Sequence, residues 1–207
     1  MFTDRRQAGQ ELAHALSSKA DTTPVVLALP RGGLPIAREV ALELAAPLDV
    51  LIVRKLGAPM NPEFAIGAVG EGNVAVLDQV SIAALGVSDV MRDRLITDAM
   101  SEIERRIALY RHGRALTDVA GRNVIIVDDG LATGATAEAA VRVVRALGAD
   151  RVTLAVPTGS HQAVDRLTPL CDEVVCLEMP EYFESVGGQY ESFPQVPDDE
   201  VAAMLVV

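Results

Sequence analysis

The stretch VIIVDDGLATGAT (residues 124–136) decides how this chain folds around its site. Four apolar residues run directly into Asp128 and Asp129, and a loop of small and hydroxyl residues follows. A short, continuous apolar run of this kind is typical of a buried strand. Two adjacent carboxylates at the end of such a strand repel each other and are costly to bury. The placement therefore indicates a ligand that compensates for that cost.

The loop after the two acids has the features of a phosphate site. Residues 133–136 (TGAT) stand where a loop turns into a helix, so backbone N–H groups and two hydroxyls can surround one anion. The loop is not a Walker A motif, because no lysine precedes its last threonine, and no G-x-G-x-x-G is present. Asp128 and Asp129 accept hydrogen bonds when ionised, so they suit the hydroxyls of a ribose. A ribose 5-phosphate meets both demands; the alternative is a capping pair followed by an ordinary turn.

Outward from this stretch, apolar runs alternate with amphipathic ones, which favours a mostly parallel sheet with helices on both sides. Such sheets bind ligands at the carboxyl ends of their strands. A hairpin is expected where GEGN (residues 70–73) joins two apolar runs. The other predicted strands cover residues 24–30, 48–56, 124–127, 151–157 and 172–180. The predicted helices cover residues 3–19, 34–46, 88–113, 136–148 and 160–170, with a short one after Pro197.

Composition narrows the function classes. The chain has 207 residues, half of them hydrophobic but only 3% aromatic, so its core is built from aliphatic side chains, as in α/β proteins. A net charge of −11 disfavours nucleic acid and anionic membranes as partners. Cys171 and Cys176, the only cysteines, have poor spacing for zinc. No signal peptide or membrane span is expected, and the predicted location is cytoplasmic.

VIIVDDGLATGAT closely resembles the binding motif for phosphoribosyl pyrophosphate (PRPP) in type I phosphoribosyltransferases. The segments LPRGGLPIA (residues 29–37) and RKLGAPMNPEFAIGAV (residues 54–69) are similar to those of a bacterial subgroup of these proteins whose substrate the motif does not settle. The resemblance implies a twisted, mostly parallel sheet flanked by helices, with a small C-terminal hood. It assigns Asp128 and Asp129 to the ribose hydroxyls. The residues implied to wrap the 5-phosphate are Ala132, Thr133, Gly134, Ala135 and Thr136.

The resemblance also places a pyrophosphate-binding loop at Arg31, Gly32 and Gly33. Two glycines after a strand let the backbone approach a ligand closely, and Arg31 supplies positive charge. In the family this loop often carries a cis peptide bond. A plain strand–helix turn is the alternative for this segment taken alone.

Arg54 and Lys55 close a predicted strand just before the hairpin. In the family a mobile loop from this region covers the site and brings basic groups to the pyrophosphate, and closure excludes water from a reactive ribosyl cation. Lys55 is the first candidate for that role, including a catalytic one, and Arg54 the second. The alternative is that both are solvated charges at a strand end.

The C-terminal tail concentrates four of the seven aromatic residues within twelve positions. The resemblance implies a hood that selects the acceptor, and Tyr182, Phe183 and Tyr190 are the candidates for stacking on a planar base. The competing interpretation of these aromatics, together with Phe193, is a satellite core or a dimer contact. The predicted organisation is a core over residues 1–178, with a flexible loop and hairpin near residues 54–78, and a hood and tail over residues 179–207.

The implied reaction is displacement of pyrophosphate from C1 of PRPP by a heterocyclic base or a related acceptor. The implied cofactor is Mg²⁺, which neutralises the diphosphate, with Asp128 and Asp129 as indirect ligands. Asp129 is the candidate general base. The expected partners are PRPP and the acceptor, and a homodimer stays open. A different class also stays open: a regulatory protein that senses PRPP or a nucleotide on the same fold.

Overall fold

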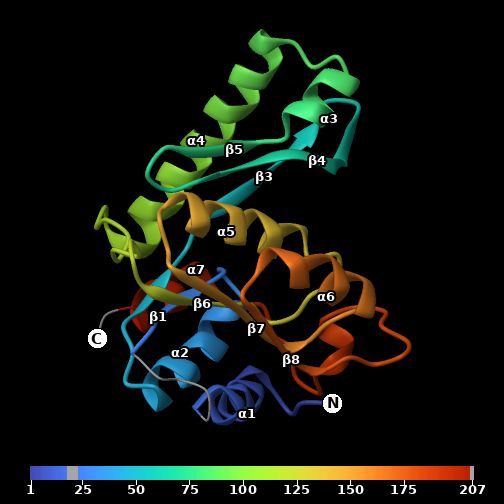
Figure 1. Cartoon of the computed structure of the whole chain (residues 1–207). Coiled ribbons are helices and arrows are strands. Elements are labelled where there is room, and N and C mark those ends of the chain that lie inside the picture. The colour runs from blue at the N-terminus through green and yellow to red at the C-terminus, as the bar shows by residue number, and fades with distance from the viewer. Residues whose placement is uncertain (18–22, 206–207) are drawn as a thin grey trace.

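The computed structural model describes residues 1–17 and 23–205, and its centre is a five-stranded parallel sheet (Figure 1). The strand order is β2-β1-β6-β7-β8. Apolar side chains on both faces of the three inner strands are buried, which explains why these strands read as continuous hydrophobic runs. The strands are β1 (Val25–Ala28), β2 (Leu48–Val50), β6 (Asn123–Val127), β7 (Arg151–Thr158) and β8 (Glu173–Glu178). The predicted α/β fold class is confirmed.

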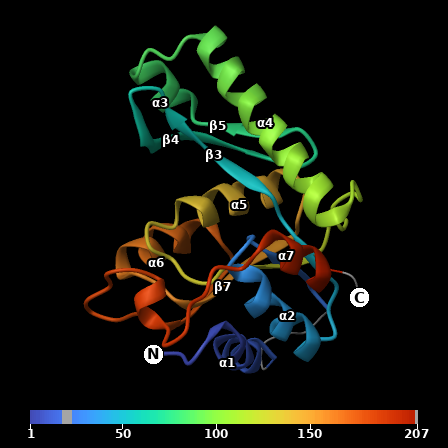
Figure 2. The ribbon, with the colours of Figure 1, turned by 180° about the vertical axis from the view of Figure 1, so that it is seen from behind.

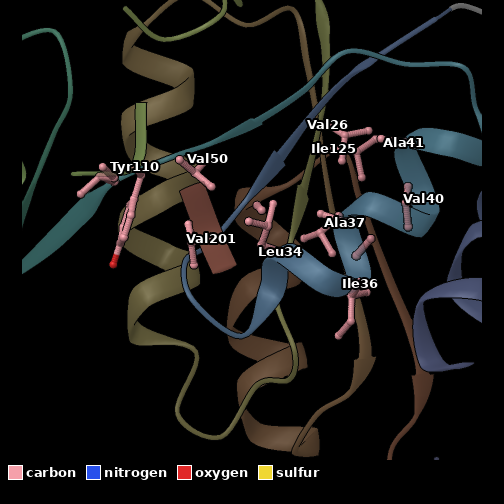
Figure 3. Close-up of a cluster of buried hydrophobic side chains, with 14 of the residues drawn as sticks. Val26, Leu34, Ile36, Ala37, Val40, Ala41, Val50, Tyr110, Ile125 and Val201 are labelled. Atoms are coloured by element: carbon pink, nitrogen blue, oxygen red, sulfur yellow. The ribbon is translucent and has the colours of Figure 1, made fainter. Parts of the chain in front are cut away.

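Helices cover both faces of this sheet (Figures 1 and 2). One face carries α1 (Arg5–Ser17) and α2 (Gly33–Glu43), and the other carries α5 (Ala135–Ala146) and α6 (His161–Leu167), which a 3-10 turn, η1 (Thr168–Leu170), follows. On the α2 face, apolar side chains of the helix pack against those of the strands (Figure 3). The side chains of that contact are Leu34, Ile36, Ala37 and Val40 of α2 with Val26 of β1 and Ile125 of β6.

A second, antiparallel sheet stands apart from the first and forms, with two helices, a unit that we call the arm (residues 53–111). Its strands are β3 (Val53–Ala58), β4 (Asn61–Gly70) and β5 (Val74–Leu77), and its helices are α3 (Gln79–Ala84) and α4 (Asp89–Arg111). The predicted hairpin is confirmed: Gly72 and Asn73 take positive φ angles of 72° and 58° in its turn. The region predicted as a flexible loop and hairpin is thus a three-stranded sheet.

The prediction of one strand over residues 48–56 was wrong. The chain leaves the large sheet after Val50 and begins the arm at Val53. Between them, Leu51 donates its backbone N–H to Ala28, whereas Ile52 donates to the Glu71 carboxylate at 2.9 Å. The apolar run continues through this change of sheet because Leu51 and Ile52 are buried at the junction, so hydrophobicity alone gave no sign of the break.

Buried charges join the base of the arm to the large sheet. Arg111, the last residue of α4, pairs with Asp49 of β2 at 3.6 Å and with Glu71 of the β4–β5 turn. Asp49 also accepts hydrogen bonds from the backbone N–H and the hydroxyl of Thr117, both at 2.9 Å. The side chain of Arg111 is completely buried, and burial lowers the pKa of its guanidinium while Asp49 opposes that change. The arm is therefore fixed to the sheet by a buried ion pair network.

The N-terminal segment lies beside the tail that follows β8. After β8 the chain continues through a 3-10 turn, η2 (Gly187–Gln189), to the final helix α7 (Asp198–Met204). Phe2 donates its backbone N–H to Gln189 at 2.9 Å and accepts one from Glu191 at 2.8 Å. The ends of the predicted first helix (residues 18–19) and of the predicted tail (residues 206–207) lie outside the described residues. Within the described part of the chain, no helix has the length and apolar character to cross a membrane.

Candidate functional site

The strand order reverses direction between β1 and β6, and this reversal creates the site. The chain moves from β1 outward to β2, passes through the arm, and returns to β6 on the other side of β1. Ala28 and Val127, the last residues of the two strands, are paired neighbours. The loops that follow them, residues 29–33 and 128–136, consequently lead to helices on opposite faces of the sheet, and in sheets of this kind ligands bind at such a point. The segments predicted to bind ribose, phosphate and pyrophosphate meet here.

The phosphate loop is shaped by its own backbone and by α6. Gly134 stands at the N-cap of α5 with a φ of 70°, and it offers no side chain to cap this helix. The N–H of Ala135 makes only a long contact, 3.4 Å, with the Thr133 hydroxyl. The helix dipole favours negative charge at this N-terminus, where backbone N–H groups can bind an anion. The preceding carbonyls are held from the other side: the Ser160 hydroxyl donates to Ala132 at 2.8 Å, and the Arg166 guanidinium donates to Thr133. The arrangement suits a phosphate group.

Asp128 and Asp129 follow directly on the last residue of β6. The backbone N–H of Asp129 donates to Oδ1 of Asp128 at 2.9 Å. Burial, with the neighbouring charge of Asp129 as the second cause, raises the pKa of Asp128 well above its ordinary value. Burial also raises the pKa of Asp129, but the charge of Arg5 opposes that change. Of the two carboxyl groups, Asp129 is thus the one with a cation beside it.

The cation is Arg5, from the first turn of α1. Its Nε and Nη2 groups donate to Oδ2 of Asp129 at 3.1 and 3.0 Å. The two side chains are only 10% and 17% exposed, so solvent screens this pair weakly. Nη1 of Arg5 donates to the backbone carbonyl of Pro194 at 2.7 Å, and its guanidinium lies 3.6 Å from the centre of the Phe193 ring. One side chain therefore joins the N-terminal helix, the acid of β6 and the C-terminal tail.

The predicted pyrophosphate loop approaches the same acid. The peptide bond between Pro30 and Arg31 is cis, as the family resemblance implied. A Cβ atom at Gly32 would lie 1.8 Å from Oδ2 of Asp129, and one at Gly33 would lie 2.6 Å from the carbonyl oxygen of Val127. At Gly33 the nearest atoms are backbone, so only glycine fits there, whereas a side chain at Gly32 would displace the Asp129 carboxylate. The Arg31 guanidinium is 3.7 Å from Asp198 at the start of α7, so its charge is shared with the tail.

The structure separates the two basic residues of β3. Side chains alternate along a strand, so Arg54 faces α4, where it lies 3.9 Å from Glu102. Lys55 faces the opposite side and lines a small cavity with Ala135 of the phosphate loop and with Glu138 of α5. The expectation that Arg54 joins Lys55 at a pyrophosphate is not supported by this arrangement. Lys55 stays the candidate for contact with the pyrophosphate.

The tail aromatics differ from the expectation as well. Tyr182 is 83% exposed, and Phe183 is half-buried. The Tyr190 ring is buried between Phe2 and Phe193, with ring centres 5.6 and 4.9 Å away, so its faces are not open to a base. This arrangement matches the satellite core that was the competing interpretation. Tyr190 reaches the site through its hydroxyl, which donates to the backbone carbonyl of Asp129 at 2.7 Å.

Sequence reasoning missed Arg5. It lies 124 positions before Asp129, in a stretch interpreted only as the start of a helix. No local pattern distinguishes Arg5 from Arg6, whose side chain is 76% exposed and lies 3.6 Å from Glu39. The one available signal was the aromatic cluster of the tail, because a buried aromatic face is a common partner for a guanidinium. The aromatic cluster indicates that a guanidinium packs against it, but it does not indicate which arginine supplies that guanidinium.

The implied Mg²⁺ fits the site only as an ion carried by its substrate. Among the described residues, no group of three or more metal-ligating side chains gathers in one place. Mg²⁺ keeps several waters and is usually bound through one or two carboxylates together with substrate phosphates. Asp128 and Asp129 can supply that contribution, and Arg5 already holds one oxygen of Asp129. The donor set suits indirect, water-mediated contact.

Comparisons with known proteins show the family of this chain. The family model described as "Phosphoribosyl transferase domain" matches residues 1–191. Two strains of Mycobacterium tuberculosis have a protein named "Putative phosphoribosyl transferase" that is 48% identical over 205 residues. The match covers 99% of this chain but 46% of that protein, so the chain spans about half the length of these relatives.

Solved structures share the fold. The crystal structure of TT1426 from Thermus thermophilus is 46% identical, with a TM-score of 0.92, and the match covers 99% of this chain and 97% of that one. A protein from Aquifex aeolicus, AQ2163, has a TM-score of 0.54 at 13% identity, over 98% of this chain and 83% of that one. At that identity the likeness concerns the fold alone.

Proposed function

We propose that this chain, which belongs to the phosphoribosyl transferase domain family, moves the 5-phosphoribosyl group of PRPP to a heterocyclic base and releases pyrophosphate. One observation carries the proposal. A phosphate loop at a helix N-terminus with a glycine N-cap, two buried carboxylates and a loop with two glycines all lie at the carboxyl ends of β1 and β6. These three groups match the phosphate, the ribose hydroxyls and the pyrophosphate of one molecule. A family match alone would not distinguish PRPP from other phosphates.

The proposed reaction needs positioning more than covalent chemistry. A ring nitrogen of the acceptor attacks C1 of the ribose with its lone pair, and the bond from C1 to the pyrophosphate oxygen breaks with its electrons on the leaving group. The proton of that nitrogen passes to solvent or to a carboxylate. The loops hold both reactants in position, and the carboxylates of Asp128 and Asp129 favour the positive charge that develops at C1.

Each part of the donor has a proposed partner. The backbone N–H groups of residues 132–136 bind the 5-phosphate, and Asp128 and Asp129 bind the ribose hydroxyls. The loop at Gly32 and Gly33 binds the pyrophosphate, with Lys55 reaching it from the arm. Mg²⁺, when bound with PRPP, neutralises the diphosphate and makes it a better leaving group.

The observed side-chain positions also bear on the acceptor. Neither face of the Tyr190 ring is open, and Arg5 covers one face of the Phe193 ring, so these two aromatics are unsuited to stacking on a base. Tyr182 and Phe183 remain the candidates for acceptor contact in the tail. We propose that residues 179–197 form the acceptor side of the site.

Release of pyrophosphate from PRPP and Mg²⁺, measured against a panel of purine and pyrimidine bases, tests the function. We expect turnover with at least one base. Binding of PRPP without turnover on any base would favour the alternative, a sensor on the same fold. Failure to bind PRPP at all would overturn both.

A matched pair of variants tests the ribose assignment. Asp129→Asn should weaken PRPP binding by roughly 1.5–3 kcal/mol, because it removes a charge-assisted hydrogen bond. Asp165→Asn removes the same charge from an exposed position on α6 and should bind PRPP as the wild type does. Isothermal titration calorimetry compares the two variants. Equal affinities would refute the role of Asp129.

A further inference from the structure

We infer that Arg5 is a positioning residue of the site, which orients the Asp129 carboxylate and fixes the C-terminal tail against it. This inference rests on the proposed function, because it gives Asp129 its role toward the ribose. It adds the N-terminal helix, which neither the motif nor the family match assigns to the site.

The first support is the geometry of the ion pair. Nε and Nη2 of Arg5 both donate to Oδ2 of Asp129, at 3.1 and 3.0 Å. Oδ2 is also the oxygen that lies against Gly32, where a Cβ atom would be 1.8 Å away, compared with 3.2 Å for Oδ1. Arg5 and the pyrophosphate loop therefore hold Oδ2 from two sides. With Oδ2 held in this way, we assign Oδ1 to the ligand.

The second support is that Arg5 is itself held on three sides. Asp129 takes two of its N–H groups, the Pro194 carbonyl takes a third at 2.7 Å, and the Phe193 ring lies 3.6 Å from the guanidinium carbon. The planar fork of a guanidinium meets several partners at once, whereas a lysine ammonium cannot reproduce these directions. A side chain fixed in this way limits the rotation of its acid partner.

The third support is the tail. The Tyr190 hydroxyl donates to the backbone carbonyl of Asp129 at 2.7 Å, so the tail contacts the acid's backbone while Arg5 contacts its carboxylate. A Cβ atom at Gly130 would lie 2.7 Å from Val186, which shows how closely the same tail lies over the loop. Phe2, Ala8 and Tyr190 form a small core beneath these contacts. Helix α1, the acid loop and the tail are thus joined, with Arg5 at their centre.

The test compares Arg5→Gln with Arg6→Gln. Both remove one arginine charge from the first turns of α1, but Arg6 is 76% exposed and lies on the other side, next to Glu39. Arg5→Gln should weaken PRPP binding roughly 10- to 100-fold, since a misplaced binding group loses much of its interaction with the ligand. Arg6→Gln should bind PRPP within about twofold of the wild type, as expected for an exposed charge.

A double-mutant cycle separates positioning from a structural role. If Arg5 acts through Asp129, the pair Arg5→Gln with Asp129→Asn should bind PRPP no more weakly than Asp129→Asn alone. Losses that add would overturn the inference. Arg5→Lys should recover part of the affinity, because one N–H contact can form again. Affinity of Arg5→Gln equal to that of Arg6→Gln would also overturn it.

Hydrogen exchange measured by mass spectrometry provides a readout that needs no ligand. Backbone amides of residues 186–193 should exchange faster in Arg5→Gln than in Arg6→Gln, with the arm unchanged in both. Unchanged exchange in the tail would overturn the inference whatever the activity. A wild-type protein that does not bind PRPP would instead sink the proposed function, and the exchange data would still decide the position of the tail.

Discussion

The Asp129 region and the arm hold their charged side chains in two opposite ways. Around Asp129, groups from α1, the loop after β1 and the tail enclose one carboxylate, and the ion pair with Arg5 is mostly buried. On the arm, Arg54 and Lys55 are adjacent in sequence but face opposite sides of a strand, and the Arg54 side chain is 44% exposed. In the first region, residues far apart in the sequence come together around one side chain. In the second, the alternation of side chains along β3 separates two residues that are adjacent in the sequence.

The attachment of the arm is where the largest effect is expected. Arg111→Met should lower the free energy of unfolding by about 3–5 kcal/mol, because the buried carboxylate of Glu71 would lose its cation and that of Asp49 would keep only the exposed Arg114. Chemical denaturation measures this change. Arg114→Met is the control, since that side chain is 54% exposed while also lying 3.7 Å from Asp49. Similar losses in the two variants would show that the buried pair is not what holds the arm.

The close approach of Gly32 to Asp129 gives the next effect. Gly32→Ala should lower PRPP affinity and turnover by roughly 100-fold, because its Cβ atom would displace Oδ2 and the Arg5 contact with it. Gly188→Ala is the control, since its Cβ atom would meet only the Ser185 hydroxyl, at 3.3 Å. Calorimetry with PRPP and a thermal melt of each variant separate lost binding from lost folding. Full affinity in Gly32→Ala would mean that Asp129 need not occupy its observed position.

The smallest expected effect concerns the two basic residues of β3, Lys55 and Arg54. Lys55→Gln should slow turnover roughly tenfold, about 1.4 kcal/mol, if one charged contact with the pyrophosphate is lost. Arg54→Gln should remain within about twofold, because Arg54 is directed toward Glu102 and an exposed ion pair contributes little. Steady-state kinetics at saturating PRPP compare them. A larger loss for Arg54 than for Lys55 would mean that the face of β3 directed at α4 serves the reaction.

Much of the fold followed from local pattern. The apolar runs at β1, β6 and β7 predicted buried parallel strands, and the positive φ angles at Gly72 and Asn73 confirm the hairpin that GEGN suggested. The failure came at residues 48–56, where one apolar run crosses between two sheets. Burial on both sides of the break kept the sequence hydrophobic, so periodicity could not reveal a change of partner.

The site divides in the same way. The sequence by itself determined the binding chemistry of the loop after β6, because the hydrophobic strand, the two acids and TGAT lie within one short segment. Only the tertiary structure decided the partner of Asp129, the opposite directions of Arg54 and Lys55, and the burial of the Tyr190 ring. The physical reason is the distance along the chain over which each property is decided. Hydrogen-bonding capacity and strand pattern are local properties, but which cation neutralises a buried acid depends on which distant segments pack together.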